Sequence, residues 1–111
     1  MAHSESRSIA AFVGAETPRS PDARFVLGRL LATPGALELL DRTNTDGLKL
    51  LQRHQSGDWG DLSPGDGAAN EFSVRHGLRI LSSYRVTPSE RVWIITEADR
   101  SATTVLLPGE A

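Results

Sequence analysis

The sequence predicts an α+β fold in which three helices pack on a mainly antiparallel sheet. Apolar residues recur at helical spacing between residues 33 and 77, and a capping residue precedes each of the three runs. After Gly77 the apolar residues alternate, which is the period of a strand. One further apolar run lies ahead of the first helix. The predicted order is therefore β-α-α-α-β-β-β, ending in a three-stranded meander.

Composition restricts the class of protein. The chain has 111 residues, which suits one domain, and it is 39% hydrophobic and 23% charged, as globular proteins are. It has no cysteine, which excludes disulfides, thiolate metal sites and a cysteine nucleophile. A formal net charge of −2 disfavours non-specific binding to nucleic acid. Because no apolar run could cross a bilayer and no secretory signal is visible, we expect a cytoplasmic protein without a membrane partner.

The N-terminal segment differs from the rest in composition. Residues 1–22 are rich in Ser, Ala and Pro, and Ile9–Val13 is their one apolar patch. Pro18 and Pro21 favour extended backbone around them. We therefore expect a disordered tail over residues 1–22 and a single α+β domain over residues 23–111.

The first elements of the domain are a strand and a short helix. The run RFVLGRLLAT, residues 24–33, is β-branched and apolar enough for a strand, and Gly28 within it indicates a bulge or a close contact. The run TPGALELLDRTN predicts a helix, with Thr33 as N-cap and Pro34 at the first helical position. Asn44 suits its C-terminal end.

A second helix is predicted over TDGLKLLQRH. It begins at a cap formed by Thr45 or Asp46 and ends before Gly57. Leu48 and Leu51 share its inward face.

A third helix is predicted over SPGDGAANEFSVRHG. Ser63 is its cap, Pro64 lies in its first turn, and Asp66 follows the cap by three residues. Phe72 is the expected apolar anchor of this helix, and Gly77 is the expected left-handed C-cap.

Three strands complete the chain. They are LRILSSYRV, RVWIITE and ATTVLLP, and the turns TPSE and ADRS separate them. The middle run is apolar on both faces, so we expect it to be the central strand of the meander.

The corner between the second and third helices is the first candidate site. Asp58, Asp61 and Asp66 lie close together in the sequence, but their spacing does not match a calcium loop. Trp59 either covers the core or forms a stacking platform or a binding anchor for a partner. If the corner binds a partner, the candidate residues are Asp58, Trp59, Asp61, Arg85 and Arg100.

Two histidines are candidates for chemistry. His54 and His76 both fall at predicted helix C-termini, where a cation is favoured by the helix dipole. The alternative makes His54 a general acid or base. Two histidines without a third ligand are a weak zinc signal, and we expect neither a metal nor a cofactor.

Polar residues around the predicted sheet allow an enzymatic alternative. Thr and Tyr are good strand formers, which accounts for most of them. A base with cations and hydroxyls could also cleave RNA without a metal, through a stabilised pentacovalent phosphate. The residues for this alternative are His54, Arg79, Tyr84, Arg100 and Thr104.

From about Phe25 to Pro108 the chain resembles a small bacterial protein family found on plasmids, phages and integrated elements. The matching stretches are TPGALELL, LLQRHQSGDWGDL, GLRILSSYRV and VWIITEADRSATTVLLP. No established activity comes with this resemblance. In topology alone, the order of helices followed by an antiparallel sheet is similar to the barnase, colicin and RelE-type ribonuclease folds.

Two hypotheses follow for the function. The first is a binding or accessory protein of a mobile element, acting on a protein or nucleic-acid partner through its loop and sheet face. The second is a metal-independent endoribonuclease of toxin type. An open cleft between His54 and the sheet residues would favour the enzyme, and a buried His54 would favour the binding protein.

Overall fold

The computed structural model describes residues 7–8 and 22–111. The elements in chain order are β1 (Arg7–Ser8), β2 (Arg29–Ala32), α2 (Pro34–Arg42), α3 (Gly47–Gln55), α4 (Pro64–His76), β3 (Ile80–Arg85), β4 (Arg91–Thr96), β5 (Ala102–Leu106) and the 3-10 turn η1 (Pro108–Glu110). The predicted order β-α-α-α-β-β-β is confirmed over residues 22–111.

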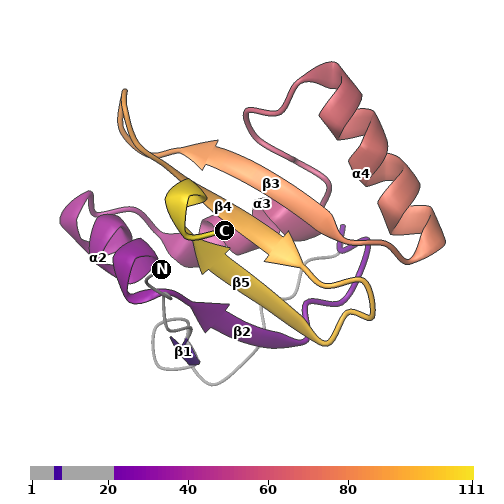
Figure 1. The fold of residues 1–111 in the computed structure, drawn as a ribbon, viewed down its shortest axis with the longest axis horizontal. Helices are drawn as coiled ribbons and strands as arrows, with labels where there is room; N and C mark the ends of the chain where they lie inside the picture. The colour runs from indigo at the N-terminus through magenta and orange to yellow at the C-terminus, as the bar shows by residue number, and fades with distance from the viewer. Residues whose placement is uncertain (1–6, 9–21) are drawn as a thin grey trace.

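The strands form one mixed sheet in the order β1-β2-β5-β4-β3. β3, β4 and β5 are antiparallel neighbours, and β4 lies between the other two, as the sequence predicts. β2 pairs with β5 in parallel, from Arg29 opposite Ala102 to Ala32 opposite Val105. The connection between parallel neighbours must cross over, and here it contains α2, α3, α4 and the other two strands of the meander (Figure 1).

One face of the sheet, which we call the inner face, is covered by α2 and α3 and forms the core (Figure 1). Alternate strand residues point to this face, and all of them are buried. They are Leu30, Ala32, Ile80, Ser82, Tyr84, Val92, Ile94, Thr96, Thr103 and Val105. The helices contribute Ala36, Leu39, Leu40, Leu50 and Leu51. The opposite face of the sheet is called the outer face below.

The predicted helix caps are present. Thr33 accepts a hydrogen bond from the Ala36 N–H at 3.1 Å, Asp46 caps α3, and Ser63 accepts from the Asp66 N–H at 3.1 Å. Each cap satisfies an N–H group that the helix leaves unpaired. Gly77 ends α4 in the left-handed conformation, at φ 66°.

β2 is shorter than the predicted strand, which covered residues 24–33. Gly28 precedes it with φ +67°, and a Cβ at this position would overlap the backbone carbonyl of Ser101. The N–H of Arg29 donates to the same carbonyl at 3.0 Å. The close contact expected of Gly28 is therefore the point at which β2 begins.

The prediction for Phe72 is wrong. Its side chain is 50% exposed and stacks on His76 one turn later, with ring centroids 4.0 Å apart. The buried residues of α4 are Asn70 and Ser73. α4 lies along the β3 edge of the sheet and not over the core (Figure 1), so polar bonds to this edge decide which face turns inward.

Hydrogen bonds from outside the sheet satisfy the edge of β3. The side-chain amide of Asn70 donates to the Leu81 carbonyl at 2.6 Å and accepts from the Leu81 N–H at 3.2 Å. The Ser83 N–H donates to the Trp59 carbonyl at 3.1 Å, and the Asp61 N–H donates to the Ser83 carbonyl at 2.7 Å. Open edge strands are prone to pair with other chains, so α4 and the loop before it protect this edge.

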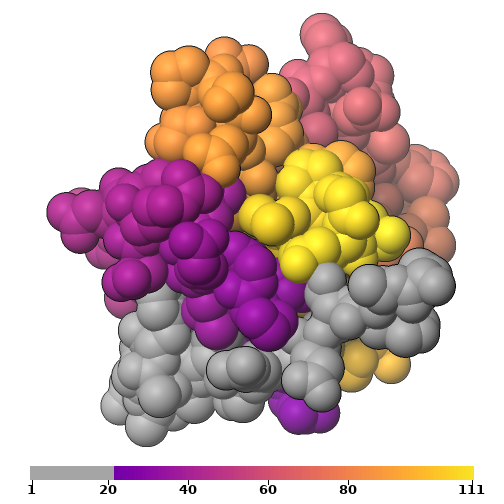
Figure 2. All heavy atoms as spheres, turned by 60° about the vertical axis from the view of Figure 1, so that its left-hand side comes forward, coloured from indigo at the N-terminus to yellow at the C-terminus, as the bar shows by residue number. Residues whose placement is uncertain are grey.

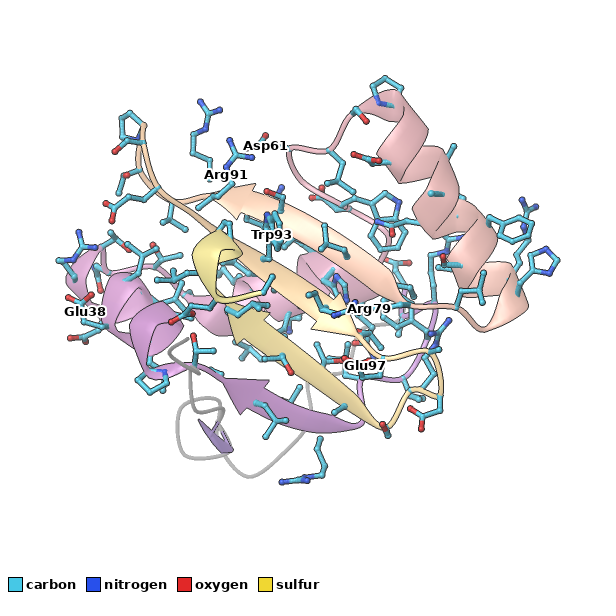
Figure 3. The ribbon with its side chains drawn as sticks, in the orientation of Figure 1. Glu38, Asp61, Arg79, Arg91, Trp93 and Glu97 are labelled. Carbon is cyan, nitrogen blue, oxygen red and sulfur yellow. The ribbon has the colours of Figure 1, made fainter. Side chains whose placement is uncertain are left out.

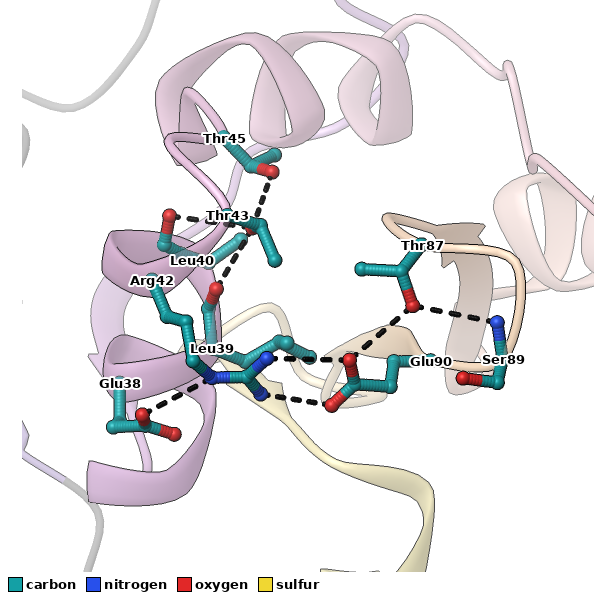
Figure 4. A network of polar contacts seen from close by, with 9 residues as sticks. All are labelled: Glu38, Leu39, Leu40, Arg42, Thr43, Thr45, Thr87, Ser89 and Glu90. Atoms are coloured by element: carbon teal, nitrogen blue, oxygen red, sulfur yellow. Dashed lines mark hydrogen bonds and ion pairs between the residues drawn. The ribbon is translucent and has the colours of Figure 1, made fainter.

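Two contacts fix the ends of α2. Arg42 forms an ion pair with Glu90 in the turn between β3 and β4, at 2.8 Å, and its Nε also donates to Glu38 at 3.2 Å (Figure 4). At the other end, the Thr33 hydroxyl donates to Glu110 of η1 at 2.6 Å. Figure 2 shows the C-terminal residues, in yellow, lying against the purple atoms of the segment that contains β2 and α2.

The expected disordered tail lies almost entirely outside the described residues, as does the apolar patch Ile9–Val13. Its described part is β1, which pairs with β2 so that residue 7 lies opposite Ala32 and residue 8 opposite Leu31. Among the described residues, no helix is both long and apolar enough to cross a membrane.

Candidate functional site

His54 is the centre of a chain of hydrogen bonds inside the core. Its side chain is 0% exposed. Nδ1 lies 2.6 Å from Ser82 Oγ, and Nε2 lies 2.8 Å from Thr96 Oγ1. Thr96 Oγ1 lies 2.7 Å from Thr103 Oγ1, and the Thr103 hydroxyl donates to the Leu27 carbonyl at 2.7 Å. The chain thus connects α3 to β3, β4, β5 and the segment before β2.

The Leu27 carbonyl at the end of this chain sets the donor and acceptor of each bond between Thr103 and His54. A carbonyl only accepts, so the Thr103 proton is used on Leu27, and Thr96 must donate to Thr103. Thr96 then accepts from Nε2–H of His54. Burial keeps the ring neutral, so His54 is in the Nε2–H tautomer and its unprotonated Nδ1 accepts from the Ser82 hydroxyl.

The pKa of His54 is lowered to about 3, mainly by burial and to a smaller extent by the nearby Arg100 guanidinium. A neutral ring cannot act as the cationic helix cap that the sequence suggested, although His54 does lie in the last turn of α3. Both ring nitrogens are bonded and no solvent reaches them, so the ring is closed to a substrate.

The structure does not bring the alternative catalytic residues together. Thr104 lies opposite Ile95 and Leu31 in the sheet, on the outer face, whereas His54 meets the inner face. Arg79 precedes β3 and is exposed. These residues therefore share no cleft with His54.

Tyr84 and Arg100, the other two members of that set, hold the fold together. The Tyr84 hydroxyl donates to the Asp58 carbonyl at 2.6 Å, and burial raises the pKa of this phenol above its usual range. The Arg100 guanidinium donates to the carbonyls of Ser73 and Leu78, at 3.0 and 2.7 Å. Arg100 thus joins the end of α4 to the turn between β4 and β5.

The corner at Gly57–Asp61 is a structured part of the fold. Trp59 is 8% exposed, and its Nε1–H donates to Glu71 of α4 at 3.2 Å. Its ring stacks on Phe25 with centroids 6.3 Å apart. Gly60 forms an isolated bridge with Ser83, and a Cβ at Gly60 would overlap the Ser83 carbonyl. Trp59 therefore covers the core, as the packing interpretation expects.

Asp58 also stabilises the corner. Its carboxylate accepts from Arg53 Nε at 2.6 Å and from the Gly60 N–H at 3.2 Å. The Arg53 guanidinium holds the pKa of this carboxyl below its usual value. The same guanidinium lies 4.6 Å from the centre of the Tyr84 ring.

Three of the candidate binding residues, Asp58, Asp61 and Arg85, are exposed. Asp61 and Arg85 face one another, with Oδ2 and Nε 3.8 Å apart. They line a shallow polar hollow of about 290 Å³ together with Arg53, Gly60 and Tyr84. Trp59 and Asp58 make their side-chain contacts around the corner, and Arg100 donates to carbonyls at the C-terminal end of α4 and just beyond it.

A larger hollow, which we call the α4 groove, lies between the N-terminal half of α4 and the outer face of β3 and β4. Its volume is about 410 Å³. It is lined by residues of the loop, the helix and the two strands, which are Asp61, Leu62, Ser63, Asp66, Ala69, Asn70, Leu81, Ser83, Arg91 and Trp93. Figure 3 shows Trp93 and Arg91 on the sheet and Asp61 on the loop that leads to α4.

The α4 groove combines an apolar floor with charged ends. Leu81 and Trp93 are partly buried and provide the floor, and Ala69 adds a small side chain from the helix. Arg91 lies at one end, beside the hollow that holds Asp61 and Arg85. A few placed polar groups around an apolar surface are typical of a binding site.

The sequence patterns do not indicate Trp93, Arg91 and Leu81 as site residues. Strand alternation could have indicated Trp93, because successive side chains of a strand point to opposite faces. Val92 and Ile94 are fully buried on the inner face, so Trp93 between them points to the outer face. The helix α4 was predicted, but its position beside β3 could not be inferred from strand alternation. Comparison of the chain with protein-family models, with curated proteins and with solved structures gives no match.

Proposed function

We propose that the chain is a binding module without enzymatic activity, and that it holds an extended segment of a protein partner in the α4 groove. The observation that carries the proposal is the partly buried pair Trp93 and Leu81, which lines a hollow of about 410 Å³. Large aromatic side chains in such places supply much of the affinity of protein interfaces. An accessory role on a plasmid or phage, which the resemblance implies, would suit a chain that acts by binding.

Charge favours a protein over a nucleic acid as the partner. The chain has a formal net charge of −2, and two aspartates, Asp61 and Asp66, line the groove with a single arginine, Arg91. Binding to a phosphate backbone depends on several Lys or Arg contacts, and carboxylates oppose it. The rim therefore suits a peptide better than an RNA strand.

The chemistry of the groove argues against the endoribonuclease alternative. That alternative needs His54 as a base, and His54 is buried with both ring nitrogens bonded. No histidine is among the described residues that line the groove. The residue that this alternative uses as its base is therefore closed to a substrate, so the reaction lacks its first requirement.

Selection from a random-peptide library displayed on phage tests the proposal. The immobilised chain should enrich a defined sequence pattern, and a synthetic peptide with that pattern should shift the indole N–H resonance of Trp93. The indole of Trp59, which is bonded to Glu71, is the internal reference and should not move.

Two matched variants locate the binding. Ala69→Gln places a longer side chain in the groove and should abolish binding, whereas Ala68→Gln changes the exposed neighbour, which does not line it. Both positions are exposed on a helix, so both variants should fold. Failure to enrich any pattern, or equal binding by the two variants, would refute the proposal.

A further inference from the structure

Two arginines face each other on neighbouring strands beside the α4 groove. Arg85 of β3 lies directly opposite Arg91 of β4. The backbone groups of Leu81 and Ser83 point away from β4, because they bond to α4 and to the loop. Arg85 lies two residues beyond Ser83, so its backbone N–H and C=O also point away from β4. Arg85 and Arg91 therefore form a non-hydrogen-bonded pair, the kind in which the two side chains come closest. Like charges in this position destabilise a sheet.

The neighbourhood neutralises only part of this charge. Arg85 lies 3.8 Å from Asp61, with both side chains about half exposed. Arg91 donates to the Ser83 hydroxyl at 3.1 Å, which is a neutral partner. Among the described residues, no carboxylate lies within ion-pair distance of Arg91. Asp61 is thus the one described carboxylate within ion-pair distance of the two guanidinium groups, since Asp66 lines the groove but pairs with neither, and the immediate surroundings of the arginine pair carry one positive charge in excess.

The excess charge lies next to an apolar surface. Arg91 and Trp93 are two residues apart on the same face of β4, and both line the α4 groove. An anion bound by the arginine pair would therefore belong to the same ligand as an apolar group on Trp93. Arginine presents several N–H donors in a fixed plane, which matches the geometry of a carboxylate.

We propose that Arg85 and Arg91 bind a carboxylate of the segment that occupies the α4 groove, so that the partner carries an acidic residue next to an apolar one. This inference rests on the proposed function and specifies its partner. A carboxylate fits better than a phosphate, because a single negative charge balances the excess and a dianion would be repelled by Asp61 and Asp66.

The phage selection described above tests this inference with peptides of known sequence. Enriched peptides should carry Asp or Glu within two residues of an aromatic or aliphatic side chain, the separation of Arg91 from Trp93. A synthetic peptide from the selection should lose at least about tenfold in affinity when its acid is changed to the amide, as for a charge-assisted contact.

A double-mutant cycle assigns the contact to the arginines. The Arg85→Gln/Arg91→Gln variant should bind the parent peptide as weakly as the wild type binds the amide peptide, and it should no longer distinguish the two peptides. Its thermal midpoint should equal or exceed that of the wild type, because a repulsion has been removed. Arg29→Gln, at an exposed position on β2, is the matched control and should leave the affinity unchanged.

The outcomes separate this inference from the proposed function. Enriched peptides that lack an acid and still depend on Ala69 would overturn the carboxylate contact and leave the groove as a binding site. No enrichment would overturn both. Tighter binding of a phosphoserine peptide than of its glutamate counterpart would overturn the choice of carboxylate over phosphate.

Discussion

The side-chain amide of Asn70 and the backbone of Leu81 form a closed pair of hydrogen bonds, 2.6 and 3.2 Å long. An amide has the donor and acceptor of a peptide group, so Asn70 takes the place of a neighbouring strand at this point of β3. The pair also sets the distance between α4 and the sheet, and hence the width of the α4 groove. A single polar side chain therefore both protects the sheet edge and shapes the candidate site.

Removing this amide should destabilise the protein. Asn70→Ala leaves the N–H and C=O of Leu81 unpaired under a helix, which should cost about 1–3 kcal/mol in free energy of unfolding. Urea denaturation measures the loss. Arg75→Ala, at an exposed position of the same helix, should change stability by less than about 0.5 kcal/mol. Equal stabilities of the two variants would show that the Asn70 pair contributes nothing.

Stability should fall in mild acid because of His54. Its pKa in the folded chain is about 3, well below the ordinary histidine value, so the unfolded chain takes up the proton first as pH falls. The contribution is complete above the unfolded pKa and is lost as pH drops toward 3. From pH 7.5 to pH 5 we expect a loss of about 2 kcal/mol, measured by urea denaturation at each pH.

The variant His54→Leu is the control for this dependence. It should be less stable at every pH, since Ser82 and Thr96 lose their partner, and its stability should be nearly flat from pH 7.5 to pH 5. Long-range nitrogen NMR of the wild type should show an unprotonated Nδ1 and a protonated Nε2. The opposite tautomer, or a variant with the full acid dependence, would contradict this account of the buried chain.

Trp59 should contribute to stability and not to binding. Its side chain is buried against Phe25 and His54, so Trp59→Ala should cost about 3–5 kcal/mol. Tryptophan fluorescence of the Trp93→Phe variant reports Trp59 alone and should show a blue-shifted emission that acrylamide quenches poorly. A red-shifted, freely quenched emission would place Trp59 at the surface.

Two glycines should respond to alanine in different ways. Gly60 has φ +76° and lies against the Ser83 carbonyl, so Gly60→Ala requires the corner to move and should cost more than about 1 kcal/mol. Gly65 lies in the first turn of α4, where a Cβ would meet only Ser63 Oγ at 4.0 Å. Gly65→Ala should be neutral or stabilise by up to about 1 kcal/mol. Thermal melts of both variants, compared side by side, test the difference.

The parts of the fold that depend on neighbours in sequence could be predicted. Thr33, Ser63 and Gly77 act at helix ends through bonds that span a few residues, and each is where the sequence places it. The central position of β4 in the meander was also predictable from its two apolar faces, although Arg91 and Trp93 leave part of its outer face open.

The parts that depend on distant contacts could not be predicted. The inward face of α4 is set by the bond of Asn70 to β3, and local hydrophobicity favoured Phe72 instead. The buried chain through His54 requires Ser82 and Thr96 to meet the ring, which follows from the register of β3 with β4 and the packing of α3. The α4 groove depends on the first of these arrangements, because Asn70 holds α4 beside β3, so no pattern within one segment of the chain indicates it.

The parallel pairing of β2 with β5 has a consequence for folding kinetics. It joins Arg29 to Ala102, so almost the whole domain lies in the loop that this contact closes. The entropy of such a closure is recovered only after β3, β4 and β5 have assembled through their short turns. We expect β2 to be absent from the transition state, with low φ-values, and the meander to form the nucleus. Loss of β5 from the C-terminal end would then also release β2, so the two ends of the domain would unfold together.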